Sequence, residues 1–239
     1  MKGVSFNSSR RVGTPLPAVK VYNQREVDEL LFLDIACQKS AAGPDFELVM
    51  DLGAECFVPL TVGGGISEES QVQLLLRGGA DKVSINSEAY RNPDLIGRIA
   101  GRYGSQCVVV SIDVRSNGSH SWECFGEAGT KLTAKSVVNW AREVADRGAG
   151  EILLTSIDRD GTMTGYDLDL VSTVAAVVSI PVIASGGAGS YQDMVDVVLR
   201  GGAAAVAASS MFLFTEQTPR MAKEFMAAAG IPVRLPMTN

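Results

Sequence analysis

Short apolar runs alternate with longer amphipathic segments along this chain. The runs are rich in Val, Ile and Leu and contain few polar positions, which is typical of strands buried on both faces of a parallel sheet. Seven runs are expected to form strands, at residues 30–35, 57–62, 82–86, 107–112, 151–156, 181–184 and 203–208. Residues 2–6 are expected to be a short extended start.

The segments between these runs have the spacing and the end signals of helices. Asp45 and the polar stretch 67–70 are in place to cap two of them, and Asn92-Pro93 opens another. The predicted helices cover residues 15–25, 45–54, 67–79, 92–103, 133–147, 167–178, 218–229 and a segment that ends at 200. Residues 114–132 break the alternation. Because 122–125 alternate between glycines, this stretch predicts a β-hairpin.

Two glycine-rich turns each follow a predicted strand and precede a predicted helix: Gly64-Gly65 and Gly186-Gly187. Glycine lets the backbone approach a ligand closely, and the N–H groups of a following helix favour an anion. The two turns are 122 residues apart in the sequence. The same offset separates two further pairs of residues, Glu29 from Glu151 and Ser87 from Ser209. A repeated offset indicates a duplication, so the chain is expected to consist of two similar halves.

Alternating strands and helices with an internal twofold repeat predict an α/β fold of one domain, residues 1–239: a (β/α)8 TIM barrel built of two half-barrels. Such a barrel has eight strands. The half-barrel counterpart of the strand that ends at Asp113 would fall before Met1. The first strand is therefore expected to be missing from this chain, and the natural protein to be longer by about 15–20 residues at ordinary strand and loop lengths.

Composition and charge argue against several classes of function. The chain is 46% hydrophobic without a run long enough to cross a membrane, and nothing at its start reads as a secretory signal. The net charge of −6 without a basic cluster argues against a nucleic-acid partner. Four cysteines without a CxxC pair suit reduced thiols of a cytoplasmic protein. The single histidine, His120, lies in a polar stretch, which excludes a multi-histidine zinc site. No metal and no cofactor are expected.

Polar residues gather where the predicted strands end, which is where barrels of this kind carry their active sites. Amide-rich turns and small hydroxyls occupy two opposite places there, which predicts two bound phosphates and hence a long bisphosphorylated substrate. Carboxylates lie between these places and suit acid–base work. The candidates are Asp34, Gly64, Gly65, Asn86, Ser87, Asp113, Thr155, Asp158, Asp160, Gly186, Gly187, Ser209 and Ser210.

Four long motifs resemble the cyclase subunit of imidazole glycerol phosphate synthase. They are LTVGGGI at 60–66, ADKVSINS at 80–87, GAGEILLTSIDRDGT at 148–162 and PVIASGGAG at 181–189. The resemblance covers essentially the whole chain. It implies a cytoplasmic lyase that takes ammonia from a glutaminase partner. The ammonia attacks a phosphoribulosyl-formimino aminoimidazole carboxamide ribonucleotide and yields imidazole glycerol phosphate and the aminoimidazole carboxamide ribonucleotide, in histidine synthesis.

The resemblance also implies roles for single residues. Asp113 matches the catalytic aspartate of strand five, whereas the strand-one aspartate has no counterpart in residues 1–239. Lys2 matches a phosphate-contacting loop, and Thr155 and Asp160 match residues near the substrate. On the opposite face, a set of charges that gates ammonia and one position at the glutaminase interface are matched. These are Glu29, Lys82 and Glu151 for the gate and Asp81 for the interface.

Simpler roles and other functions stay open. Asp113 could cap a turn, Asp160 could be a turn former, and the gate residues could be ordinary surface pairs. One alternative function is an ammonia-using paralogue that amidates a nucleotide-linked sugar in surface-polysaccharide synthesis, a branch that stretches 22–30 and 55–60 favour. Another is a catalytically inactive barrel that only activates a glutaminase. A related isomerase of the histidine pathway would leave the gate residues unexplained.

Overall fold

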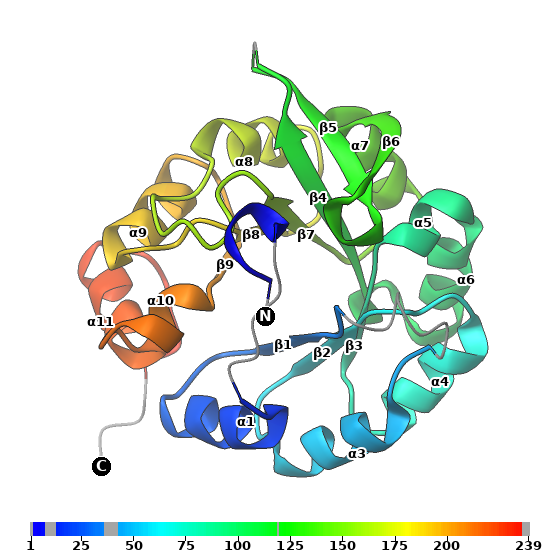
Figure 1. The fold of residues 1–239 in the computed structure, drawn as a ribbon, viewed down its shortest axis with the longest axis horizontal. Helices are drawn as coiled ribbons and strands as arrows, with labels where there is room; N and C mark the ends of the chain where they lie inside the picture. The colour runs from blue at the N-terminus through cyan, green and yellow to red at the C-terminus, as the bar shows by residue number, and fades with distance from the viewer. Residues whose placement is uncertain (1, 8–12, 36–42, 119, 236–239) are drawn as a thin grey trace.

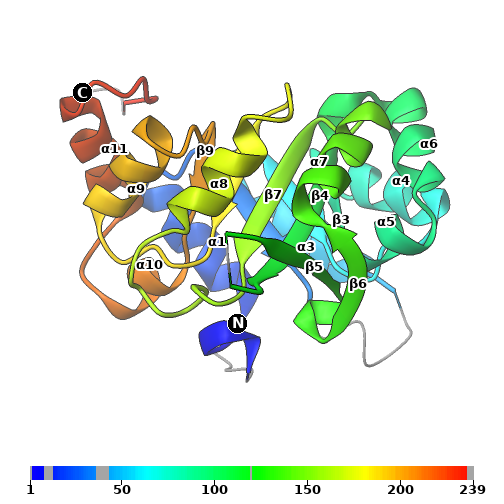
Figure 2. The ribbon, with the colours of Figure 1, turned by 90° about the horizontal axis from the view of Figure 1, so that it is seen from above.

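A curved parallel sheet forms the centre of the molecule, and helices cover its outer side (Figure 1). The structure is a computed structural model and describes residues 2–7, 13–35, 43–118 and 120–235. The N-terminal segment lies across one end of the sheet, whereas the C-terminal residues lie at the outer edge of the ring of helices (Figures 1 and 2).

Within the described ranges, seven strands follow one another around the sheet. They are β1 (Leu30–Leu33), β2 (Leu60–Gly63), β3 (Lys82–Ile85), β4 (Val108–Ser116), β7 (Glu151–Ser156), β8 (Val182–Ser185) and β9 (Ala205–Ala207). They pair in this order, and every neighbouring pair is parallel. This arrangement confirms the predicted (β/α)8 class, with β1 and β9 at the two ends of the strand order.

Helices alternate with these strands. They are α1 (Pro15–Gln24), α3 (Phe46–Glu55), α4 (Glu69–Arg77), α6 (Asp94–Tyr103), α7 (Val137–Asp146), α8 (Leu168–Ala175), α9 (Tyr191–Leu199) and α11 (Pro219–Ala228). Two short helices, α5 (Ser87–Arg91) and α10 (Ser210–Phe214), follow β3 and β9 and were not predicted. Each is only five residues long, too short for a helical period to show in the sequence.

The internal repeat is confirmed by the positions of the elements. Helix α9 begins and ends 122 residues after α4. Each helix carries the same N-terminal capping box, in which Gln71 of α4 and Asp193 of α9 accept hydrogen bonds from the backbone before the helix. Asp45 and Asp167, again 122 residues apart, cap α3 and α8 in the same way. The two halves therefore share their helix ends as well as their glycine turns.

The predicted helix at 133–147 was wrong in its first turn. Residues 131–136 form strand β6 (Lys131–Ser136), which pairs antiparallel with β5 (Trp122–Gly126), and β5 in turn pairs with the end of β4. Helix α7 begins only at Val137 because the Ser136 side chain caps it by accepting from the Asn139 N–H. The hairpin excursion is confirmed and is longer than predicted (Figure 2).

Other boundaries also differ from the prediction, and three of these differences have a clear local reason. Residues 4–6 form the 3-10 turn η1 (Val4–Phe6) instead of an extended start, since Ser5 N–H donates to Asp160 O at 2.9 Å. The 57–62 strand begins at Leu60, after a proline that cannot donate to a ladder. The 30–35 strand is shorter and not fully buried, with Leu33 41% exposed, because β1 has a strand neighbour on one side only within the described ranges.

The hairpin is held against the second half-barrel by a shared capping residue. Asp167 accepts from the Leu170 N–H with one carboxylate oxygen and from the Trp122 Nε1–H, at 3.1 Å, with the other. Trp122 is buried, so its N–H needs this partner. Asp45, the repeat counterpart, accepts from the Leu48 N–H.

This difference predicts unequal costs for two equivalent substitutions. Asp45→Ala removes only a helix cap and is expected to lower the free energy of unfolding by about 1 kcal/mol. Asp167→Ala removes the same cap and also leaves the buried Trp122 N–H without an acceptor. The expected loss in the free energy of unfolding is therefore about 2–3 kcal/mol. Urea unfolding of the two variants measures both values. Equal losses would show that the Trp122 contact contributes nothing.

Candidate functional site

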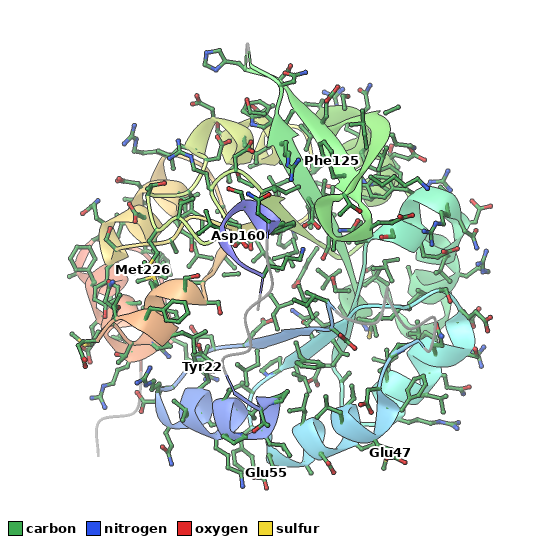
Figure 3. All side chains as sticks on the ribbon, viewed as in Figure 1. Tyr22, Glu47, Glu55, Phe125, Asp160 and Met226 are labelled. Carbon is green, nitrogen blue, oxygen red and sulfur yellow. The ribbon has the colours of Figure 1, made fainter. Side chains whose placement is uncertain are left out.

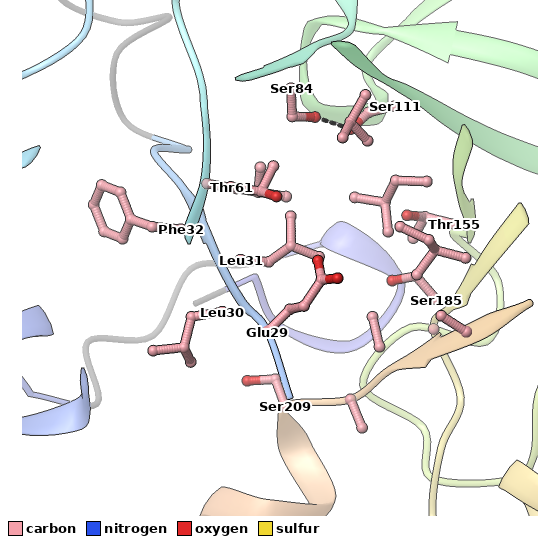
Figure 4. A pocket seen from close by; sticks show the side chains of 18 of the residues that line it. Glu29, Leu30, Leu31, Phe32, Thr61, Ser84, Ser111, Thr155, Ser185 and Ser209 are labelled. Carbon is pink, nitrogen blue, oxygen red and sulfur yellow. Dashed lines mark hydrogen bonds between the residues drawn. The ribbon is translucent and has the colours of Figure 1, made fainter. Parts of the chain in front are cut away.

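A large cavity of about 1600 Å³ passes along the inside of the curved sheet. Glu29 and Glu151, at the starts of their strands, line one end of it, and Asp113, Thr155 and Asp160 line the other. In Figure 4, Glu29 and Leu31 point toward the side of the strand where Thr61, Ser111 and Thr155 lie, whereas Leu30 and Phe32 point to the other side. The cavity therefore reaches both the face where the strands begin and the face where they end. The sequence predicts the ammonia gate at the first face and the active site at the second.

Asp113 is the buried carboxylate at the catalytic end of the cavity. It lies on β4, is 6% exposed, and pairs in register with Thr155 of β7. Asn86 Nδ2 donates to its Oδ2 at 3.0 Å, and Lys2 Nζ lies 3.6 Å from the same oxygen. Burial raises the pKa of Asp113 above its ordinary value, while Lys2, Asn86 and Thr155 act to lower it. The pKa of Asp113 therefore depends on opposing effects of burial and of its polar neighbours.

A second carboxylate, Asp160, lies in the loop after β7 near the N-terminal turn (Figure 3). Burial above all raises its pKa from 3.8 to about 6, a net value in which Lys2 acts to lower the pKa and the charge of Asp113 acts to raise it. Its backbone oxygen accepts from the Ser5 N–H. The site thus brings two carboxylates and one lysine together, whereas the phosphate contact of Lys2 stays a prediction.

Lys2 reaches this site because the N-terminal segment is anchored over it. Its Nζ lies 3.3 Å from the centre of the Phe6 ring, and a positive φ at Ser5 and Phe6 turns the chain back over the loop after β7. The Phe6 ring also lies close to Gly129, where a side chain would collide with it. A single cation is thereby placed against Asp113 and within the electrostatic reach of Asp160.

Both glycine turns line the cavity and both need glycine for structural reasons as well. Gly64 and Gly186 have positive φ angles of 108° and 88°. A Cβ at Gly64 would strike the backbone of Asp34, and one at Gly186 would strike the backbone of Ser156. Gly65 and Gly187, which follow, also have positive φ. The turns therefore bring strand ends close together, and their binding of phosphate stays a prediction.

The small hydroxyls at the strand ends are not all equivalent. Ser209 and Ser210, at the start of α10, line the cavity, and so do Asn86 and Ser87 at the start of α5. The Ser87 Oγ accepts from the Glu127 N–H at 2.9 Å, so it already has a partner in the hairpin. The Asn86 Oδ1 is buried and has no hydrogen-bond partner within the described structure, which makes it a candidate acceptor for a ligand donor.

At the opposite end of the barrel, Lys82 joins the two glutamates of the predicted gate. Its Nζ donates to Glu29 Oε2 at 3.0 Å and to Glu151 Oε1 at 2.8 Å. Burial acts to lower the pKa of Lys82, but the two carboxylates outweigh it and raise that pKa. Glu29 directly precedes β1, and Lys82 and Glu151 begin β3 and β7, so the structure brings together residues that are up to 122 positions apart in the sequence.

Between these two ends, the interior carries hydroxyl groups that the sequence reading overlooked. Thr61, Ser84 and Ser111 are buried, and the hydroxyls of Ser84 and Ser111 lie 2.6 Å apart (Figure 4). The signal was a serine or threonine at an inward position of an otherwise branched apolar strand. These groups make the interior polar without adding charge.

Other candidates have structural partners. Asp81 is exposed near the gate, and its Oδ2 accepts from the Leu60 N–H at 2.8 Å, so its place at a partner interface stays a prediction. His120 is exposed on the hairpin, 3.5 Å from Asp169. Cys56, Cys107 and Cys124 are free thiols, and Cys37 lies outside the described residues. Among the described residues, no three His, Cys, Asp or Glu side chains gather as a metal site.

The helices bear on one further property. In the part of the chain that the structure describes, each helix is too short or too polar to cross a lipid bilayer.

Comparison with known proteins agrees with this geometry. Residues 1–218 match the family described as histidine biosynthesis protein. The chain belongs to this family. It is 49% identical over 234 residues to imidazole glycerol phosphate synthase subunit HisF of Hyphomonas neptunium, an alignment that spans 98% of this chain and 92% of that relative.

The raised pKa of Asp160 predicts a pH-dependent contribution to stability. An unfolded carboxyl of pKa 3.8 and a folded one of about 6 mean that the folded state binds more protons between these values. The neutral form therefore favours folding at low pH, and this contribution is lost as the pH rises through 6. Asp160→Asn is expected to match the unsubstituted protein at about pH 4 and to be more stable by about 1–3 kcal/mol at about pH 8.

Urea unfolding at these two pH values measures this difference. Glu216→Gln, at a residue that does not line the cavity, serves as the control. A gain for Asp160→Asn of the same size at both pH values would contradict a raised pKa in the folded state.

Proposed function

We propose that this chain is the cyclase subunit of imidazole glycerol phosphate synthase, a lyase of histidine synthesis working as one phosphate-binding barrel domain. The observation that carries the proposal is the placement of the Lys82 cluster and the Asp113 site at opposite ends of the same parallel strands, with buried hydroxyls between them. The named relative supports the same reaction.

The interior suits the passage of ammonia from the Lys82 cluster to Asp113. Ammonia is small and neutral, and it both donates and accepts hydrogen bonds. Thr61, Ser84 and Ser111 offer hydroxyls along the way, which can exchange hydrogen bonds with it without trapping it as a charged group would. At the start of the path, the charged pairs of Lys82 can open or close only by exchanging partners, which is the behaviour of a gate.

At the other end, Asp113 is proposed to move protons as the amine attacks and the imidazole ring closes. A general acid or base works best when its pKa is near the working pH, and burial raises the pKa of Asp113 in that direction. Asn86 and Lys2 hold the carboxylate in one position. Thr155 and Asp160 lie beside it and are proposed to contact the substrate.

The two phosphates of the substrate are proposed to bind at the two ends of the cavity mouth. One end has Gly64, Gly65, Asn86 and Ser87, and the other has the repeat-related turn with its serines: Gly186, Gly187, Ser209 and Ser210. The twofold repeat places these groups on opposite halves of the barrel. A long molecule with a phosphate at each end and a reacting centre between them fits this layout.

A glutaminase partner is proposed to dock on the face where the strands begin. Phe57, in the loop before β2, is 82% exposed there, and a large exposed apolar side chain suits a protein interface. Asp81 and the Lys82 cluster lie at strand starts on the same face. Docking at this place would deliver ammonia directly to the gate.

The first test measures turnover of the bisphosphorylated formimino substrate with ammonium salt as the nitrogen source. Asp113→Asn keeps the size of the side chain but removes its acid–base function, so kcat is expected to fall by about 10²–10⁴-fold. Asp94→Asn, at an exposed carboxylate that pairs with Arg147, is the control and is expected to keep full activity.

Retained activity in Asp113→Asn would refute its acid–base role. Absence of turnover in the folded, unsubstituted chain would refute the cyclase proposal. Incorporation of ammonia into a nucleotide-linked sugar would then support the sugar-amidating paralogue, and stimulation of a glutaminase alone would support an inactive barrel.

A second test addresses the gate in the complex with the glutaminase. Lys82→Met leaves Glu29 and Glu151 without their shared cation, so the yield of imidazole product per glutamine hydrolysed is expected to fall. Lys20→Met breaks a surface pair with Glu55 of similar length, 3.1 Å, and is expected to leave that yield unchanged. Equal yields for both variants would show that Lys82 does not control the passage.

A further inference from the structure

A cluster of four charges stands at the mouth of the cavity, on the first half-barrel: Glu88, Arg91, Glu127 and Lys131. Arg91 NH1 lies 3.6 Å from Glu88 Oε2 within the same helix. Arg91, the last residue of α5, donates from NH2 to Glu127 Oε1 at 2.6 Å. Lys131 Nζ lies 3.3 Å from the same oxygen. Glu127 belongs to the 3-10 turn η3 (Glu127–Gly129) between β5 and β6. One carboxylate oxygen is thus held by two cations, the arrangement with which proteins also hold a phosphate oxygen.

Part of this partly exposed cluster lines the mouth of the cavity. Arg91 and Glu127 both line the cavity, as do Asn86 and Ser87 at the other end of α5. The Ser87 Oγ accepts from the backbone N–H of Glu127. Glu127 therefore holds the hairpin against this predicted phosphate site with its backbone and pairs with Arg91 through its side chain. Arg91 and Lys131 lower the pKa of Glu127, which therefore stays ionised.

Few cations line this cavity in the part of the chain that the structure describes. Among the described residues that line it, the other cations are Lys2, Lys223 and Arg234. Lys2 is committed to Asp113, and the remaining two pair with Asp28 just before β1, at the strand-start face. Arg91 is accordingly the lining cation that stands beside the first predicted phosphate site.

The two halves of the barrel differ at this point. The residue 122 positions after Arg91 is Leu213, in helix α10. The second predicted phosphate site therefore lacks an equivalent arginine on its short helix, although it has the same glycine turn and serines. A bisphosphorylated molecule whose two ends differ would therefore meet one phosphate site with a guanidinium on its short helix and one site without it.

We propose that Arg91 and Lys131 form the recognition site for one phosphoryl group of the substrate and that Glu127 occupies it as an internal counter-ion until the ligand displaces it. This inference rests on the proposed function for the identity of the ligand. The group recognised is a phosphate monoester, whose oxygens match the two N–H donors of a guanidinium face. Exchange of Glu127 for phosphate fixes which end of the ligand lies on the first half-barrel.

The test uses inorganic phosphate as the probe and the intact chain, followed by the NMR signals of the Arg91 side chain and of the Ser87 and Ser209 amides. Glu127→Gln removes the competing charge and is expected to tighten binding at the Ser87 end by about threefold. Arg91→Ala is expected to weaken binding there by about tenfold and to leave the Ser209 end unchanged.

A matched pair elsewhere on the surface controls for general effects of charge. Arg102 and Glu69 lie 2.5 Å apart with 56% and 27% of their side chains exposed, compared with 2.6 Å, 55% and 37% for Arg91 and Glu127. Arg102→Ala and Glu69→Gln are expected to leave phosphate binding at the Ser87 end unchanged. Weaker or unaltered binding in Glu127→Gln, or the same loss in Arg91→Ala and Arg102→Ala, would overturn the proposal.

Turnover separates this inference from the proposed function. With the bisphosphorylated formimino substrate, Arg91→Ala is expected to raise KM about tenfold with kcat nearly unchanged, since a guanidinium that only binds the phosphate stabilises the bound substrate and the transition state equally. If the unsubstituted chain does not turn this substrate over, the cyclase proposal fails and the phosphate titration still decides the role of Arg91. If it does and Arg91→Ala leaves KM unchanged, the role of Arg91 is refuted alone.

Discussion

Parallel pairing of β4 with β3 on one side and β7 on the other is the constraint on which this structure depends. Parallel strands bring like ends together, so Asp113 meets Thr155 at one end and Lys82 meets Glu151 at the other. The same register turns Ser84 and Ser111 toward each other in between. The pairing of these strands therefore places the Asp113 site at one end, the Lys82 cluster at the other end, and buried hydroxyl groups between them.

The two ends place a lysine among carboxylates in different surroundings. At the strand-start end, Lys82 donates to Glu29 and Glu151, which raise its pKa and keep it a cation. At the strand-end face, Lys2 lies close to Asp113, and burial raises the pKa of Asp113 and of the half-buried Asp160. The first arrangement stabilises a charged group, whereas burial in the second disfavours one.

The internal repeat gives the two half-barrels similar structures, and the hairpin after β4 makes them different. The glycine turns, capping boxes and helix caps recur with one offset and hold the strands in place. The hairpin after β4 breaks this symmetry. It docks on Asp167 through Trp122 and on Ser87 through Glu127, so it ties the second half of the frame to the first. The charged cluster at Arg91 arises from that contact.

The sequence by itself determined the fold class, the repeat and the residue types of the site, because strand hydrophobicity, glycine turns and caps are local signals. Local patterns could not place residue 133, since strand β6 depends on pairing with β5, nor reveal helices as short as α5 and α10. The contacts of Lys2 with Asp113 and of Arg91 with Glu127 join segments more than 30 residues apart. Only the folded chain decides such contacts. Folding brings these charged groups close together and partly buries them, and neither effect exists in the unfolded chain.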